Sequence, residues 1–290
     1  MKKAIAYALA AFAVAGCFGV NWWLTARRHA RLVGQRRAAF AACGIFTDGS
    51  SAYATLPPTV PVREAVKEIG ADLFANSHFG KSKRSCAACH PRDMGGTDGL
   101  RHGAHVTMPV ENLAFQRVFG PAGAETNLCA VVGRMVFGED YLAFPRDWDF
   151  RGRVGGGLRL RGRMDEAFGP DWNTNEVLTA IGEYAWSLIT PPTRFDHFKF
   201  GAGHPEALDP AAKRGFDVFK DARCIRCHSG PALGGERAEK GVKVPALRGL
   251  SWRPLAKRGD DALCDKASAM PGAPRSETKR ADLSAFLRCL

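Results

Sequence analysis

The spacing of apolar residues predicts a mostly helical chain. In residues 62–74, "VREAVKEIGADLF", apolar side chains recur at the spacing of one buried helix face. Residues 174–190, "TNEVLTAIGEYAWSLIT", give the clearest helical pattern of the chain, and Pro191 and Pro192 end it. Few stretches alternate between apolar and polar residues as half-buried strands do. We therefore expect helices to supply the fold.

Two further helices are predicted in the second half of the chain. Residues 205–220 lead directly toward a cysteine-containing stretch, and residues 276–290 form a closing helix with Ser276 as its N-cap. The Pro-rich segment 55–62, "TLPPTVPV", is typical of a linker. Folded structure is therefore expected to begin near Val62.

The N-terminus has the pattern of a segment that directs export or attaches a chain to a membrane. Two lysines precede an apolar run from Ala4 to Leu24. The residues before Cys17 resemble a lipoprotein processing site, whereas the length of the run suits an uncleaved anchor helix. We expect residues 1–25 to be this signal or anchor and residues 26–61 to be a basic, Pro-rich linker. Either alternative places the remaining chain beyond the cytoplasmic membrane.

Length and charge limit the classes of function. The chain has 290 residues, a formal net charge of +12 and 46% apolar residues, which leaves room for two modest domains. Arginines cluster within 27–37, beside the apolar N-terminus, and within 151–163, in a Gly-rich stretch. No module that combines basic and aromatic residues is recognisable, so we do not expect nucleic acid as a partner.

Two stretches carry the candidate chemistry, because "SCAACH" at 85–90 and "RCIRCH" at 223–228 each contain Cys-x-x-Cys-His. Two cysteines at this spacing can form thioethers to the vinyl groups of one haem, and the adjacent histidine then reaches the iron. The alternatives are a thioredoxin-like pair or half of a zinc site, which would need a second ligand pair nearby. We assign two covalently bound haem c groups, one to Cys86, Cys89 and His90 and one to Cys224, Cys227 and His228.

Four more cysteines remain once the haem residues and Cys17 are set aside. An even number could form two disulfides in an oxidising compartment, and four free thiols are the alternative. Cys264 and Cys289 are the simpler pairing, because both lie in the last stretch of the chain. The set is Cys43, Cys129, Cys264 and Cys289.

With these residues in hand, the sequence resembles the bacterial di-haem cytochrome c peroxidase and MauG family from about residue 68 to the end. "GADLFANSHFGKSKRSCAACH", followed by "GGTDG", is similar to the region of the family's first haem motif. "EYAWSLITPPTRFDHFKFG" is similar to its connector helix and turn, and "AAKRGFDVFKDARCIRCHSGP" to the region of its second motif. "VKVPALRGL" and the closing helix follow in the family's order.

The resemblance implies a fold and a division of labour. It implies two c-type cytochrome-like domains, a peroxidatic haem domain at 62–200 and an electron-transfer haem domain at 201–290. Arg248, within "VKVPALRGL", is implied as a cofactor-binding residue. The sixth iron ligand decides what each haem can do, because a reacting iron needs an open or displaceable position.

Candidates for these sixth ligands are few. After His228 the chain has no histidine, no tyrosine and a single methionine, Met270. A thioether ligand raises the reduction potential and suits an electron reservoir, so we predict Met270 for the second haem, with a surface role as the alternative. "RHGAH" resembles the family's distal segment, which implies His102, with His105 as the alternative, as a displaceable ligand of the first haem.

The sequence departs from the family pattern at several places. The family's Trp-Asp-Gly-Arg segment, with its tryptophan between the haems, is replaced by "GPAGAETNLC", and Trp148 is the nearest substitute. The family's distal acid, which would move peroxide protons, has two candidates here, Glu139 and Asp147. Asn112 resembles the family's calcium-binding asparagine, which implies a calcium site.

These features predict a periplasm-facing, membrane-attached peroxidase that reduces hydrogen peroxide to water. The resemblance implies a small soluble cytochrome c or cupredoxin as electron donor, and a homodimer. One alternative is MauG-like, peroxide-dependent oxidation of a partner protein, which uses a tyrosine ligand that this chain lacks after His228. The other is a non-enzymatic di-haem electron carrier, in which both irons stay six-coordinate.

Overall fold

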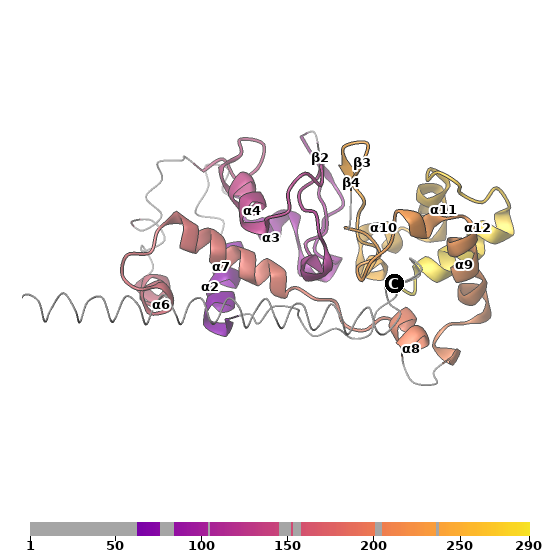
Figure 1. Cartoon of the computed structure of the whole chain (residues 1–290), viewed down its shortest axis with the longest axis horizontal. Helices are drawn as coiled ribbons and strands as arrows, with labels where there is room; N and C mark the ends of the chain where they lie inside the picture. The colour runs from indigo at the N-terminus through magenta and orange to yellow at the C-terminus, as the bar shows by residue number, and fades with distance from the viewer. Residues whose placement is uncertain are drawn as a thin grey trace, which may run out of the picture. The chain divides into compact units, whose positions relative to one another are not determined.

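A computed structural model describes most of the chain beyond residue 62 (Figure 1). Contacts divide the chain into Met1–Gly44 and Ile45–Leu290, and all of the described residues belong to the second unit. The predictions for residues 1–61, including Cys17 and Cys43, lie outside the described residues. None of the described helices is long and apolar enough to cross a membrane. The described residues are 63–75, 84–103, 105–144, 152, 158–200, 205–235 and 238–290.

The first lobe, which we define as the described residues from 63 to 188, is built on two packed helices. These are α2 (Glu64–Ala75) and α7 (Thr174–Ser187), and they confirm the two helices predicted at the outset. The helices approach closely at Gly70, where an added Cβ would lie 1.9 Å from the carbonyl oxygen of Ala180. Two further helices, α4 (Leu128–Phe137) and α6 (Leu158–Phe168), complete the lobe.

The second lobe, the described residues from 194 to 290, repeats this arrangement. Helices α9 (Pro210–Asp221) and α12 (Glu277–Leu287) pack together, and an added Cβ at Gly215 would lie 1.9 Å from the Asp282 carbonyl oxygen. Ser276 accepts a hydrogen bond from the Lys279 N–H, so the predicted N-cap is confirmed. The remaining helices are α8 (Arg194–Phe200), α10 (Pro254–Lys257) and α11 (Asp260–Ser268).

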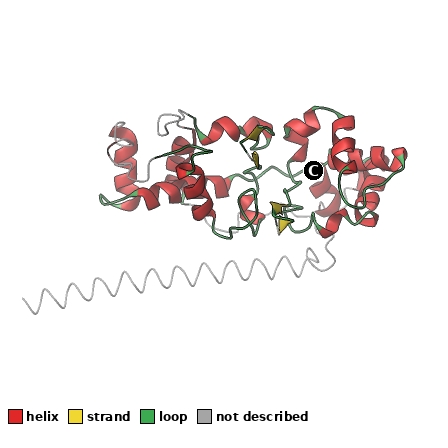
Figure 2. Cartoon of the chain, turned by 90° about the horizontal axis from the view of Figure 1, so that it is seen from above, coloured by secondary structure: helices red, strands yellow, loops and turns green. Residues whose placement is uncertain are grey.

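Short elements connect the helices. Figure 2 shows two small hairpins between the helices of the two lobes, so the prediction of a mostly helical chain is confirmed. The antiparallel hairpins pair β1 (Arg101–His102) with β2 (His105–Val106), and β3 (Ala238–Glu239) with β4 (Val242–Lys243). Single turns of helix are α3 (Cys86–Cys89), η1 (Arg92–Met94), η2 (Leu113–Phe115), η3 (Pro205–Ala207), η4 (Cys224–Arg226) and η5 (Leu250–Trp252).

Each lobe has its own apolar core. The first core, which α2 and α7 share, includes Val66 and Ile181. The second core includes Phe195 and Phe286. Backbone hydrogen bonds cross between the lobes: the Arg117 and Val118 N–H groups donate to the Gly235 carbonyl at 2.9 and 3.0 Å. The boundary at residues 200 and 201 stays a prediction.

Candidate functional site

The first Cys-x-x-Cys-His motif forms one turn of helix that ends at His90. Nδ1 of His90 lies 3.0 Å from the carbonyl oxygen of Gly96, in a loop where Gly95 and Gly96 have positive φ. With Nδ1 donating to this carbonyl, Nε2 carries the free lone pair. Burial lowers the pKa of His90, which favours the neutral imidazole that a metal requires. The loop therefore sets the tautomer and orientation of an iron ligand.

A large cavity lies beside this motif. It contains about 1160 Å³ of space between atoms, counted out to its open mouth, and Cys86, Cys89 and His90 form part of its wall. Much of the remaining wall is apolar and comes from α4, α7 and the loop before them. Two thiols, a free imidazole nitrogen and apolar walls are the donor set and surroundings that fit a haem. These apolar residues include Val110, Leu113, Val131, Met135, Val136 and Ile181.

Three of the four motif cysteines, Cys86, Cys89 and Cys224, are not activated thiols. Burial raises the pKa of Cys86 to about 12, and it also raises the pKa values of Cys89 and Cys224. Redox-active dithiols need a lowered pKa, because the thiolate is the nucleophile. The surroundings of these cysteines therefore argue against the thioredoxin-like alternative.

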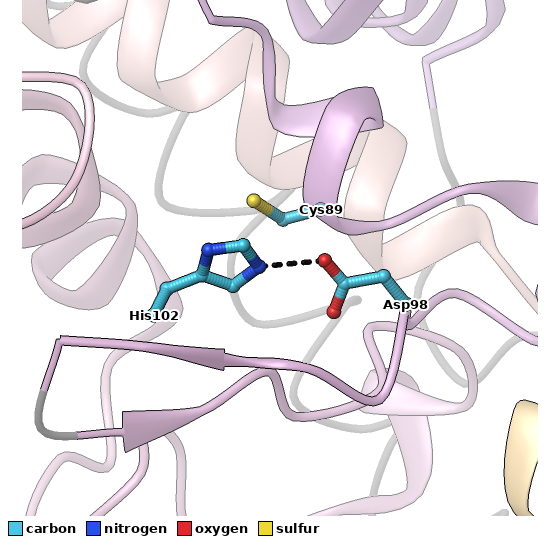
Figure 3. Close-up of side chains that lie close together, drawn as sticks. All are labelled: Cys89, Asp98 and His102. Atoms are coloured by element: carbon cyan, nitrogen blue, oxygen red, sulfur yellow. Dashed lines mark hydrogen bonds and ion pairs between the residues drawn. The ribbon is translucent and has the colours of Figure 1, made fainter.

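His102 lies in the wall of the cavity, on strand β1. Its Nε2 lies 2.7 Å from Oδ2 of Asp98, and the Cys89 sulfur lies close to both side chains (Figure 3). Burial of the Asp98 carboxyl is outweighed by hydrogen bonds from the Leu100 N–H and from His102, so the pKa of Asp98 is lowered. The structure thus brings His102 to the first motif, as the resemblance implied. The side chain of His105 lies outside the described residues.

The acidic group at the cavity differs from the predicted ones. Among the described residues of the turn after α4, Asp140 and Tyr141 line the cavity, whereas Glu139 does not, although both acids are exposed. A turn closed by the Tyr141 N–H and the Gly138 carbonyl, 3.0 Å apart, separates these neighbouring side chains. Burial raises the pKa of Tyr141. Asp140 is therefore a further candidate acid in the same turn, the role of Glu139 stays a prediction, and Asp147 and Trp148 lie outside the described residues.

The second motif holds its histidine in the same way. Nδ1 of His228 lies 3.2 Å from the carbonyl oxygen of Leu233, which leaves Nε2 free, and burial lowers its pKa. Cys224 packs against the aromatic core of the lobe, which includes Phe195 and Phe286. The donor set again fits a haem. The two motifs therefore share one local design and differ in their surroundings.

Met270 and Arg248 have contrasting environments. The Met270 side chain is 37% exposed, in the turn after α11, and its assignment as an iron ligand stays a prediction. Arg248 is buried, and its guanidinium donates to Oδ2 of Asp196 at 2.5 Å. The same oxygen accepts from the Thr193 N–H and hydroxyl. A buried charge needs a partner, and Asp196 supplies one for Arg248. Contact of Arg248 with a cofactor stays a prediction.

The assignment of Asn112 as a calcium ligand stays a prediction, and its amide oxygen has protein partners in this structure. Its Oδ1 accepts hydrogen bonds from the Thr190 N–H and the Thr190 hydroxyl, each at 3.1 Å. These two donors use both lone pairs of the amide oxygen, which is the atom that calcium would bind. Asn112 instead joins the first lobe to the segment that leads into the second.

The predicted disulfide between Cys264 and Cys289 is wrong, because both are free thiols. The sulfur of Cys264 faces the Arg280 carbonyl at 3.5 Å, and that of Cys289 faces the Ala285 carbonyl at 3.3 Å. Each thiol therefore has its own acceptor, and Cys289 is buried at the end of the core. Cys129 is a free, exposed thiol.

A buried lysine from the second lobe also reaches the cavity. Lys243, on β4, is 3% exposed and forms part of the cavity wall. Sequence reasoning missed it, together with Asp98, Asp140 and Tyr141. For Asp98 a signal existed, since it lies in the "GGTDG" segment of the family resemblance.

Residues 64–204 match the family model described as di-haem cytochrome c peroxidase. This match covers just under half of the chain, and through it the chain is similar to the di-haem cytochrome c peroxidase family. It is 27% identical over 227 residues to a cytochrome c551 peroxidase of Nitrosomonas europaea, covering 72% of this chain and 64% of the relative. It is also 27% identical over 202 residues to the cytochrome c peroxidase Ccp of Escherichia coli, covering 63% of this chain and 41% of the relative.

Another relative of this chain is a methylamine utilization protein, MauG, from Methylophilus methylotrophus. The two are 27% identical over 191 residues, covering 60% of this chain and 55% of the relative. The chain thus spans less than two thirds of the length of each of these three curated relatives.

Solved structures share the fold. A MauG-like protein associated with microbial copper homeostasis superposes with a TM-score of 0.62 at 17% identity, covering 81% of this chain and 91% of that one. The diheme peroxidase BthA from Burkholderia thailandensis gives 0.59 at 14% identity, covering 83% and 89%. The predicted fold, two haem-motif lobes of mostly helical structure, is thus that of known di-haem proteins.

Proposed function

We propose that this chain is a periplasm-facing di-haem c-type peroxidase that reduces hydrogen peroxide to water. The observation that carries the proposal is the contrast between two equally held imidazoles. His90 faces a cavity with ionisable side chains in its wall, and His228 belongs to a lobe whose buried Arg248 and Asp196 are paired with each other. Haem c is bound covalently in both lobes, through Cys86 and Cys89 in the first and Cys224 and Cys227 in the second.

His102 and Asp98 regulate access to the first haem. When bound, this haem supplies the iron at which peroxide takes up two electrons and two protons and becomes two water molecules. A displaceable ligand needs another partner while it is away from the metal. The 2.7 Å contact between His102 Nε2 and Asp98 Oδ2 supports Asp98 as that partner. We therefore assign His102 the role of displaceable ligand and Asp98 the role of holding it aside.

Asp140 is the proposed proton-transfer group. Peroxide cleavage requires a group that accepts a proton from one oxygen and returns it to the other. Asp140 lines the cavity next to Tyr141, whereas Glu139 does not, although both acids are exposed. Asp140 therefore replaces Glu139 as the candidate acid, in the same turn of the chain.

The second haem serves as the electron reservoir. Met270 remains its proposed sixth ligand, because a thioether suits a high potential. A small soluble cytochrome c or cupredoxin is the proposed donor, and attachment to the membrane through the N-terminus and a homodimer complete the proposal. The MauG-like alternative is disfavoured because no tyrosine follows His228. The electron-carrier alternative is disfavoured by the ionisable side chains of His102 and Asp140 in the cavity wall beside His90.

Haem content and peroxide turnover test this proposal together. The protein is produced in a host that attaches haem c and exports it, and the haem is counted by its pyridine complex in wild type, Cys86→Ser and Cys224→Ser. We expect two haems in wild type and one in each variant, with steady peroxide consumption by wild type on a reduced small cytochrome c. Two attached haems without any reaction with peroxide would favour the electron carrier.

A further inference from the structure

Lys243 occupies an unusual position for a lysine. It belongs to β4 in the second lobe, yet its side chain is buried at the cavity of the first lobe. Its backbone N–H donates to the Pro121 carbonyl at 2.8 Å, and Pro121 lines the same cavity. The lysine is therefore held at the first motif by the backbone of its own strand.

The ammonium group of Lys243 has no acidic partner among the described residues. Its Nζ donates to Oε1 of Gln116 at 2.7 Å, and this amide is neutral. The Gln116 Nε2 donates to the Glu111 and Asn112 carbonyls, so the orientation of the amide is fixed. A lysine ammonium has three N–H donors, and the Gln116 amide accepts only one of them.

Buried charges in proteins are normally paired, because removing an ion from water is costly. Burial, assisted by the nearby positive charge of Arg253, lowers the pKa of Lys243 to about 8. A lysine whose only task was to join the lobes could be replaced by an uncharged side chain at lower cost. The position therefore calls for an anion that is not supplied by the described residues.

The haem proposed for this cavity would bring such an anion, since every haem c carries two propionate carboxylates. We propose that Lys243 binds a propionate of the haem held by Cys86, Cys89 and His90, so that the second lobe supplies a counter-charge for the first haem. This inference rests on the proposed function only in requiring haem at the first motif. Its chemistry is an ammonium–carboxylate ion pair of the charge-assisted kind.

The ion pair has a consequence for the first haem. A buried positive charge favours the reduced, less positive iron, so its removal should lower the reduction potential. It also ties the β3–β4 hairpin of the second lobe to the cofactor of the first. The same hairpin offers a matched control, because Lys240 is exposed in the turn between the two strands.

Lys243→Met and Lys240→Met are compared as full-length proteins with both haems attached. The potential of the first haem is measured by spectroscopic titration, and the propionate bending bands are recorded by resonance Raman spectroscopy. For Lys243→Met we expect a lower potential, with the reduced fraction of the first haem at fixed applied potential falling at least about tenfold. We also expect a shift in one propionate band, with no change in either readout for Lys240→Met.

Lys243→Arg covers the case in which the methionine variant does not fold. Arginine keeps the charge, so we expect the potential to stay near the wild-type value while the propionate band moves, because the donor geometry changes. Unchanged propionate bands in both Lys243 variants would overturn the inference. Failure of wild type to attach haem at Cys86 and Cys89 would instead overturn the proposed function, so the two failures are distinguishable.

Discussion

The two haem-motif regions hold their histidines alike and surround them differently. Nδ1 of His90 contacts the Gly96 carbonyl, and Nδ1 of His228 contacts the Leu233 carbonyl. The first motif lines a cavity with ionisable side chains in its wall, and the second packs against the apolar core of its lobe. The comparison teaches that the Cys-x-x-Cys-His motif fixes how iron is bound, while the residues around it decide what the iron can reach.

The polar groups are distributed just as unequally. Asp98, His102, Asp140, Tyr141 and Lys243 line or adjoin the first cavity. In the second lobe, Arg248 and Asp196 neutralise each other in a buried ion pair. Ionisable groups at a cavity are typical of a reaction site, whereas paired ones inside a lobe are typical of a scaffold.

The largest predicted effect on the reaction with peroxide comes from removing the histidine of each motif in turn. His90→Ala is expected to abolish reaction with peroxide, because the first iron loses its protein ligand beside the cavity. His228→Ala should stop turnover with a protein donor but preserve a single reaction of the first haem after chemical reduction. Stopped-flow absorbance of the two variants separates these outcomes. Equal loss of the single reaction in both would contradict the division of roles.

The assignment of Asp140 as the proton-transfer acid predicts the next largest effect, on the rate of reaction with peroxide. Asp140→Asn should slow the reaction with peroxide by about 10²- to 10⁴-fold, because the amide cannot carry the proton. Glu139→Gln is the matched control, since Glu139 is the neighbouring acid in the same turn and does not line the cavity, and it should react like wild type. Both rates are measured with the half-reduced protein under excess peroxide. A slow Glu139→Gln beside a normal Asp140→Asn would reverse the assignment.

The acid shows where sequence reasoning reaches its limit. The helices, the two motifs and the Ser276 cap follow from local patterns, and the structure agrees with them. Glu139 and Asp140 are neighbours of the same charge, and only the fold of their turn decides which one lines the cavity. Lys243 could not be predicted at all, because its position depends on contact between lobes far apart in sequence.

The false disulfide has a related cause. Cys264 and Cys289 are near in sequence, yet each sulfur faces a carbonyl of α12. Chain separation says nothing about the direction of two Cβ atoms, which a disulfide requires. The calcium role of Asn112 stays a prediction, and its contact with Thr190 from a distant segment could not be read from the sequence either.

The two helix crossings allow a stability test of each lobe. Gly70→Ala and Gly215→Ala each place a Cβ 1.9 Å from a backbone oxygen of the facing helix. We expect each to destabilise its own lobe by about 3 kcal/mol, the upper end of overpacking costs. Denaturant unfolding, followed at the absorbance of each haem, should show the first lobe weakened by one variant and the second by the other. Identical losses at both haems would mean that the lobes unfold as one unit.

The smallest predicted effect is a pH dependence of the second lobe. Hydrogen bonds from Arg288, and then from Ser284, lower the pKa of Asp260 below its ordinary value. Its contribution to stability is therefore present above pH about 4 and is lost as the pH falls through the lowered value. The free energy of unfolding is measured in urea at a series of pH values. Asp260→Asn should lose slightly less stability at acid pH than wild type does. An equal loss in both proteins would show that the pair of Asp260 and Arg288 contributes nothing measurable to stability.

The central claim is that the first haem reacts while the second stores an electron. The most direct test is to reduce the protein by one electron, add peroxide, and record visible and electron paramagnetic resonance spectra. The account predicts that half-reduction makes the first haem high-spin, through release of His102, and that peroxide then oxidises the protein. If both haems stay low-spin and peroxide causes no change, the claim is contradicted and the chain is an electron carrier.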